Sequence, residues 1–105
     1  MNRVKSFLYQ IYQSKEAYGI VYYDSLGRDA GILLIRNDDT GAFNIGVDLK
    51  YLNPQNSYLV EDVDKVTSTV FPGKEFQNGL TVDFDKHTMS RMLFLTHQGS
   101  EGPVR

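Results

Sequence analysis

Hydrophobic and polar residues alternate along much of this chain in short runs, with turn-forming residues between the runs. From Phe43 to Leu49, every second residue is apolar, and the residues between them are polar or glycine. The segment 80–84 repeats this alternation. A period of two is typical of a strand with one buried face and one face in water. Both segments are therefore predicted to be half-buried strands.

Five further segments are rich in β-branched and aromatic residues, which favour strands. They are 18–23, 30–36, 57–63, 67–71 and 89–96. Gly, Asn, Asp and Pro residues, which favour turns, separate most of the segments. The chain is therefore predicted to be an all-β protein, an antiparallel two-sheet β-sandwich of the Greek-key type. We expect about seven strands, at spacings of about ten residues.

The first seventeen residues fit two patterns. Apolar residues between Val4 and Tyr12 recur at helical spacing, which favours a short helix over about 4–13. Apolar and aromatic residues also alternate from Phe7 to Ile11, so an edge strand is the alternative. We prefer the helix.

The domain organisation follows from these elements. The segment 1–17 precedes the sandwich, which is predicted to span 18–96. The segment 97–105 contains two glycines and a proline in its last seven residues, and it is predicted to be a flexible tail. We find no internal repeat or linker between these parts.

Two of the predicted strands, 30–36 and 89–95, are apolar on both faces. A two-layer sandwich buries only one face of each sheet, so the other face of these strands needs a cover. One interpretation is that the N-terminal segment shields them. The other is that they form a docking face for a neighbouring domain. The residues that we assign to this interface are Ile32, Leu34, Met92 and Phe94.

Composition excludes several classes of protein. The 105 residues suffice for one domain with one hydrophobic core. The absence of cysteine excludes a disulfide framework and is compatible with the cytoplasm or the bacterial periplasm. The formal net charge of −2, with scattered basic residues, argues against a nucleic-acid partner. No apolar run approaches the about 20 residues of a membrane span, and no signal peptide is recognisable, so we expect no membrane partner.

Three segments resemble parts of one known type of domain. The segment 22–36 reads as a strand, a glycine turn and a hydrophobic strand that ends in arginine. The segment 52–62 has the pattern L-x-P-x3-Y-x3-D, and 73–82 has the pattern G-x2-F-x2-G-L-x-V. Together they resemble the C-terminal antiparallel β-sandwich of glycoside hydrolases that have a (β/α)8 catalytic barrel. The closest type is the α-galactosidase kind of glycoside hydrolase family 36, and the resemblance covers about 18–96.

This resemblance implies a non-catalytic accessory domain. In such enzymes the catalytic carboxylates lie on the barrel strands, and nothing in this chain matches them. The resemblance therefore implies no catalytic residue, no cofactor and no enzyme activity for this chain. It implies one partner, the catalytic (β/α)8 barrel of the parent chain, which the domain would pack on and stabilise.

The ionisable residues point to no metal centre. Glu61, Asp62 and Asp64 form the densest acidic cluster, and Asp62 and Asp64 share one face if the strand continues. We interpret the cluster as a solvated strand end, with a weak calcium site as the alternative. His87 and His97 lack metal-ligand spacing and are predicted to be exposed. Asp38 and its neighbour Asp39 are predicted to lie in a plain turn.

Tyrosine offers the alternative function. The chain has seven tyrosines and no tryptophan, and a tyrosine ring can stack on a sugar while its hydroxyl forms hydrogen bonds. We interpret these tyrosines mainly as core and rim residues. A free-standing carbohydrate-binding module is the alternative hypothesis, with Tyr12, Tyr23 and Tyr51 as its candidate sugar-binding residues.

Overall fold

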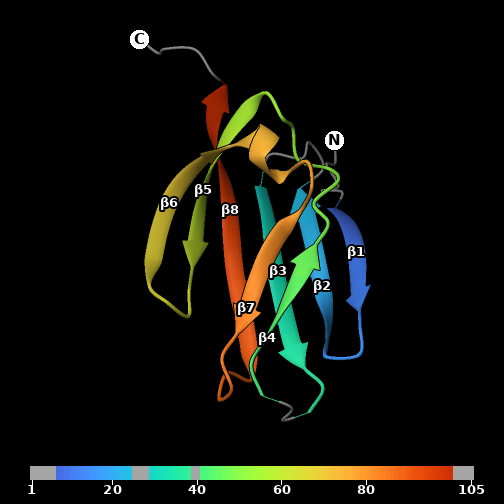
Figure 1. Ribbon diagram of the computed structural model, residues 1–105. Helices are drawn as coiled ribbons and strands as arrows, with labels where there is room; N and C mark the ends of the chain where they lie inside the picture. Colours follow the sequence, from blue (N-terminus) through green and yellow to red (C-terminus); the bar gives the residue numbers. More distant parts are fainter. Residues whose placement is uncertain (1–6, 25–28, 39–40, 101–105) are drawn as a thin grey trace, which may run out of the picture.

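The computed structural model describes residues 7–24, 29–38 and 41–100. These residues form eight β-strands and one short 3-10 helix, η1 (Figure 1). Their bounds are β1 Phe7–Gln13, β2 Ala17–Asp24, β3 Asp29–Arg36, β4 Phe43–Val47, β5 Asn56–Asp62, β6 Thr67–Pro72, η1 Gly73–Phe76, β7 Leu80–Phe84 and β8 Ser90–Ser100.

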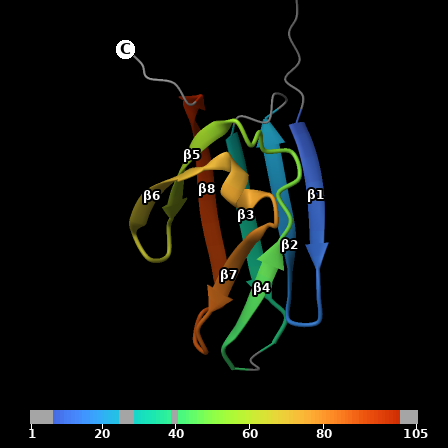
Figure 2. The same cartoon turned by 45° about the horizontal axis from the view of Figure 1, so that its top comes forward.

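The strands form two antiparallel sheets. The large sheet has six strands in the order β1-β2-β3-β8-β5-β6, and the small sheet consists of β4 and β7. Figures 1 and 2 show the small sheet lying across one face of the large sheet. The prediction of an all-β, antiparallel two-sheet fold is therefore confirmed. The strand β8 returns to lie beside β5, as a Greek-key connection requires, although β7 lies in the other sheet.

The N-terminal segment forms a strand, so the helix predicted over 4–13 is wrong for the residues described. The strand β1 pairs with β2 over its whole length, from Phe7 opposite Asp24 to Gln13 opposite Tyr18. In so short a segment the helical and strand periods share most apolar positions, and pairing with β2 decides between them. Residues 1–6 lie outside the described part of the chain.

The C-terminal tail predicted from residue 97 is also wrong for residues 97–100. The strand β8 continues to Ser100 because the first residues of β5 pair with it. The register shifts between Ser57 and Tyr58, which marks a β-bulge or irregularity in the pairing. Residues 101–105 lie outside the described part.

The hydrophobic core lies between the two sheets. In the small sheet, Ile45, Val47 and Val82 are buried while Asn44 and Thr81 face water, which confirms the two half-buried strands. Burying each such side chain contributes about 1.5–3 kcal/mol to stability. On the large sheet the inward residues come from four strands. They are Ala17, Val21, Tyr23, Ala30, Ile32, Leu34, Tyr58, Val60, Leu93 and Leu95.

Residues that carry the family resemblance have structural roles. Gly79 has φ +91°, and a Cβ atom there would lie 2.7 Å from the carbonyl oxygen of Val47, so only glycine fits. The buried Tyr58 hydroxyl accepts a hydrogen bond from the backbone N–H of Asn53 at 2.9 Å. This bond fixes the loop that precedes β5.

The buried Arg36 closes one end of the sandwich. Its guanidinium lies over the ring of Phe43, 5.0 Å from the centroid, and that ring stacks on Phe84. The guanidinium also donates to the backbone oxygens of Gly41 and Lys86. The positive charge of Arg36 is thus stabilised by aromatic rings and backbone carbonyl oxygens at this end of the core.

Candidate functional site

One face of the large sheet is uncovered. The small sheet lies over one side, and no described element lies over the other (Figures 1 and 2). Residues paired across neighbouring strands point to the same side of a sheet, so the register identifies the residues of the uncovered side. We call this side the outer face. Its apolar residues are Tyr9, Ile11, Tyr18, Ile20, Tyr22, Leu33, Ile35, Leu59, Val70, Met92 and Phe94.

The middle of the outer face contains a row of aromatic residues. Tyr9 lies opposite Tyr22, Tyr22 opposite Gly31, and Gly31 opposite Phe94. A Cβ atom on Gly31 would lie 2.7 Å from the ring of Tyr22, so this ring extends over the glycine. Gly31 therefore makes room for an aromatic side chain that lies across the sheet.

The exposure of these residues is unusual for apolar side chains. Ile11 is 71% exposed, Tyr9 is 63% exposed, and Phe94 is 37% exposed. Single exposed apolar residues are ordinary, but a contiguous apolar patch over several strands marks an interaction site. The outer face is therefore the candidate functional site.

Charge is sparse on the outer face. Its described positions include no Lys or Arg, and its acidic residues lie toward the margin. Glu61 is on β5, next to the edge strand β6, and Asp24 and Asp29 lie at the ends of β2 and β3. The centre of the face is thus apolar and uncharged.

Two of the four predicted interface residues lie on the outer face. Met92 and Phe94 do, whereas Ile32 and Leu34 are 1% and 0% exposed and pack in the core between the sheets. The assignment of Ile32 and Leu34 to an interface is therefore wrong. Both faces of β3 are apolar, so its pattern does not tell which face the small sheet covers.

The predicted shielding by the N-terminal segment is not seen in the described residues. The strand β1 extends the large sheet at its edge and does not cross its outer face. The second interpretation of the doubly apolar strands, a docking face, stays a prediction.

The three candidate sugar-binding tyrosines do not form a platform. Tyr23 is fully buried, so its assignment as an exposed sugar-binding residue is wrong. Its hydroxyl donates to the side-chain oxygen of Gln10, and burial raises the pKa of Tyr23 to about 12. Tyr12 is half-buried against the core.

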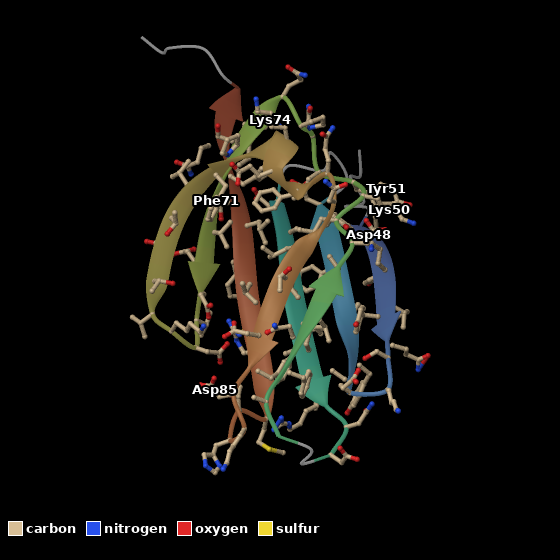
Figure 3. The ribbon with its side chains drawn as sticks, in the orientation of Figure 1. Asp48, Lys50, Tyr51, Phe71, Lys74 and Asp85 are labelled. Atoms are coloured by element: carbon tan, nitrogen blue, oxygen red, sulfur yellow. The ribbon has the colours of Figure 1, made fainter. Side chains whose placement is uncertain are left out.

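Only Tyr51 of these three is exposed. Its ring contacts Tyr23 edge-on, with 5.1 Å between the centroids. Figure 3 shows it with Asp48 and Lys50 on the segment that follows β4. The tyrosines that share one exposed surface are instead Tyr9, Tyr18 and Tyr22 of the outer face. The alternation of apolar residues in the two segments carries this signal, but the helical spacing of the first segment competes with it.

The predicted acidic cluster divides between the two sides of the sheet, because Glu61 lies on the outer face whereas Asp62 and Asp64 contact the buried Arg91. The interpretation of the cluster as a solvated strand end is therefore wrong for Asp62, whose side chain is 14% exposed. Asp62 and Asp64 share one side, as predicted, and both accept hydrogen bonds from Arg91, at 2.5 and 3.2 Å. Asp83 adds a third carboxylate at 3.1 Å and also pairs with Lys65 at 2.9 Å.

The electrostatics of this cluster favour the charged forms. The hydrogen bond from Lys65 lowers the pKa of Asp83 below its ordinary value. Burial opposes the charge of Arg91, but the hydrogen bond to Asp83 and the charge of Asp62 outweigh it and raise the pKa of Arg91. Among the described residues, no group of three or more His, Cys, Asp or Glu side chains is arranged to hold a metal ion. The guanidinium lies where a calcium ion would have to bind.

The two histidines differ in exposure. His87 is exposed, as predicted, in the turn between β7 and β8. His97 is half-buried in β8, where its ring contacts Tyr58 edge-on at 6.3 Å between centroids, so its predicted exposure is wrong. Asp38 is exposed beside the end of β3, and Asp39 lies outside the described residues.

Comparisons with known protein families, with curated proteins and with solved structures gave no match. Within the described ranges, no helix has the length and apolar character to cross a membrane.

Proposed function

We propose that this chain is a non-catalytic accessory domain that packs on a larger neighbouring domain through its outer face. The observation that carries the proposal is the uncovered apolar surface from β1 to β8, with Ile11, Tyr9 and Phe94 exposed on it. A face of this kind is normally buried in the functional assembly.

The area of the face gives the scale of the interaction. Six strands about 4.8 Å apart and seven residues of about 3.4 Å each define a surface of about 24 by 24 Å. Covering these about 600 Å² corresponds to a gross gain on the order of 10 kcal/mol, from which ordering and desolvation costs are subtracted. A neighbouring domain in the same chain pays less of this cost because it is already tethered.

We propose that the neighbour is the catalytic barrel of a glycoside hydrolase of the family 36 α-galactosidase type. The support is the resemblance of 22–36, 52–62 and 73–82 to the C-terminal sandwich of such enzymes. A barrel needs about 200 residues or more, so it must be a separate domain from these 105 residues.

Thermal unfolding of the enzyme chain that contains this domain tests the proposal. Removing the domain is expected to lower the midpoint of the barrel by about 5 °C or more, because a loss of a few kcal/mol shifts a domain of that size by about 2–4 °C per kcal/mol. Phe94→Glu in the intact chain is expected to act in the same direction. Thr81→Glu, on the exposed side of the small sheet, is the matched control. A barrel that is equally stable without the domain would contradict the proposal.

One observation favours the second candidate function, a carbohydrate-binding module. Tyr9 and Tyr22 are exposed and directly opposite each other on β1 and β2, which gives two aromatic rings on one flat surface. Their neighbours Ile11, Ile20 and Leu33 are aliphatic, which fits a protein partner better than a sugar with many hydroxyl groups. Titration with galactosides while NMR shifts are followed decides between the two. Shifts confined to Tyr9 and Tyr22 at millimolar sugar would favour the module.

A further inference from the structure

The outer face is complementary to itself. We propose that the isolated chain forms a two-fold dimer in which two outer faces pack together. The inference rests on the docking face of the proposed function and concerns the chain when no barrel covers that face. Its occupant is then a second copy of the same chain.

The order of the strands gives the centre of the outer face, and in the dimer that we propose the symmetry axis runs through it along the strands. The strands β3 and β8 are the two middle strands of the large sheet. A two-fold dimer brings the same surface of both copies together, so its axis passes through the middle of the patch. An axis along the strands, between β3 and β8, places β3 opposite β8 of the second copy and β2 opposite β5 of the second copy.

The residues on either side of this axis match. The central row runs Tyr22, Gly31, Phe94, Glu61 across β2, β3, β8 and β5. Rotation about the axis places the bulky Phe94 opposite Gly31 of the second copy. The ring of Tyr22 lies over Gly31 within each copy, so Phe94 meets this ring of the second copy, and two aromatic rings pack together on each side of the axis.

Charge favours this arrangement as well. A two-fold interface brings charges near its centre close to their own copies, which is repulsive. On the outer side of β3 and β8, the two strands beside the axis, the charged residue described is Asp29 at the end of β3, and the positions between this end and Ser90 carry no charge. Glu61 lies on β5, one strand further from the axis. An apolar centre with a polar rim is the usual composition of a stable interface.

The area is sufficient. About 24 by 24 Å on each copy gives about 1,200 Å² in total, above the about 1,000 Å² that a specific interface needs. Two sheets that pack face to face about 10 Å apart form an ordinary β-sandwich arrangement. The dimer would therefore have the small sheets on its two outer surfaces and the two large sheets in the middle.

Sedimentation velocity from about 1 to 500 µM tests the proposal on the chain as it stands, with a protomer mass of 12.0 kDa. We expect reversible dimerisation with a dissociation constant in the micromolar range. Phe94→Glu places two carboxylates beside the axis and is expected to weaken the dimer at least about 100-fold. Thr81→Glu carries the same charge change on the far side of the molecule and is expected to leave the dimer intact.

Circular dichroism and the unfolding midpoint check that each variant is folded. Should Phe94→Glu not fold, Ile11→Lys, at a side chain that is already 71% exposed, replaces it and is expected to weaken the dimer about 10-fold. A wild-type chain that stays monomeric at 500 µM overturns the dimer. A variant that dimerises as strongly as the wild-type chain also overturns the proposal. The two copies must then pair through another surface, such as the edge of β1 or β6.

These outcomes are separate from those of the barrel proposal. A monomeric isolated chain does not affect the expected loss of barrel stability when the domain is removed. Conversely, the dimer can be weakened by Phe94→Glu while the barrel is equally stable without the domain. These two results together overturn the barrel proposal and support the dimer.

Discussion

Replacing Arg91 by methionine should destabilise the domain more than any other single loss of positive charge in the acidic cluster. The side chain of Arg91 is 3% exposed and contacts three carboxylates, of Asp62, Asp64 and Asp83. Methionine fills part of the space of the arginine stem but leaves the carboxylates facing one another without a cation. The most affected is Asp62, which is 14% exposed.

The magnitude follows from the exposure of each pair. A hydrogen bond to a charged, buried partner contributes about 1.5–3 kcal/mol, which applies to the pair of Arg91 and Asp62. Asp64 and Asp83 are 33% and 46% exposed, so water screens them and each contributes at most about 1 kcal/mol. The expected loss is about 3 kcal/mol. For a domain of this size it lowers the unfolding midpoint by more than about 10 °C.

Urea unfolding followed by circular dichroism measures this loss. The matched control is Lys65→Met, which removes one positive charge from the same Asp83. Both partners of that pair are about half exposed, so water screens the pair and the control is expected to lose far less stability than Arg91→Met. A loss of less than about 1 kcal/mol in Arg91→Met, similar to the control, would refute the reasoning, because burial would then add nothing to the ion pair.

Three further predictions concern single positions. Val66 has φ 54° although it is β-branched and 88% exposed, so Val66→Gly should stabilise the domain by about 1 kcal/mol in urea unfolding; an unchanged or lower stability would contradict the strain. Gly79→Ala should destabilise it by about 2 kcal/mol in the same assay, because the new methyl group meets the carbonyl of Val47. The folded-state pKa of Tyr23, about 12, lies above its unfolded value of about 10, so the folded state keeps its proton longer. The stability that Tyr23 contributes is complete below pH 10 and is lost between pH 10 and 12; Tyr23→Phe should show a smaller decrease over this window in unfolding experiments, and an equal decrease would count against it.

Much of the fold could be predicted from the sequence because seven strands have local signals. The strands β4 and β7 alternate clearly, since one side of each faces water and the other faces the core. Turn residues bound most of the other strands. The remaining strand, β1, has a weaker local signal, because its seven residues also fit a helix. Its pairing with β2 decides the structure, and this pairing is not visible in the sequence of the segment alone.

The site could be predicted only in part. Alternation shows that Ile32 and Leu34 share one face of β3, but which face is covered depends on β4 and β7, which come from other parts of the chain. For the same reason, the sequence does not show that the face of β2 that contains Tyr23 is the buried one. The partners of Arg91 were not foreseeable either, because Asp62 and Asp64 are 29 and 27 residues away in sequence.

The position of β8 has a consequence for how the chain is made. It is the last of the described strands in the sequence, yet it lies between β3 and β5, and no other described strand joins the two halves of the large sheet. A nascent chain that ends at residue 89 therefore contains a three-stranded meander, β1-β2-β3, and a separate hairpin, β5-β6, each with unpaired strand edges. Such intermediates are prone to aggregate. The described strands become one cooperative unit only after β8 has left the ribosome, and early termination before Ser90 should yield insoluble protein.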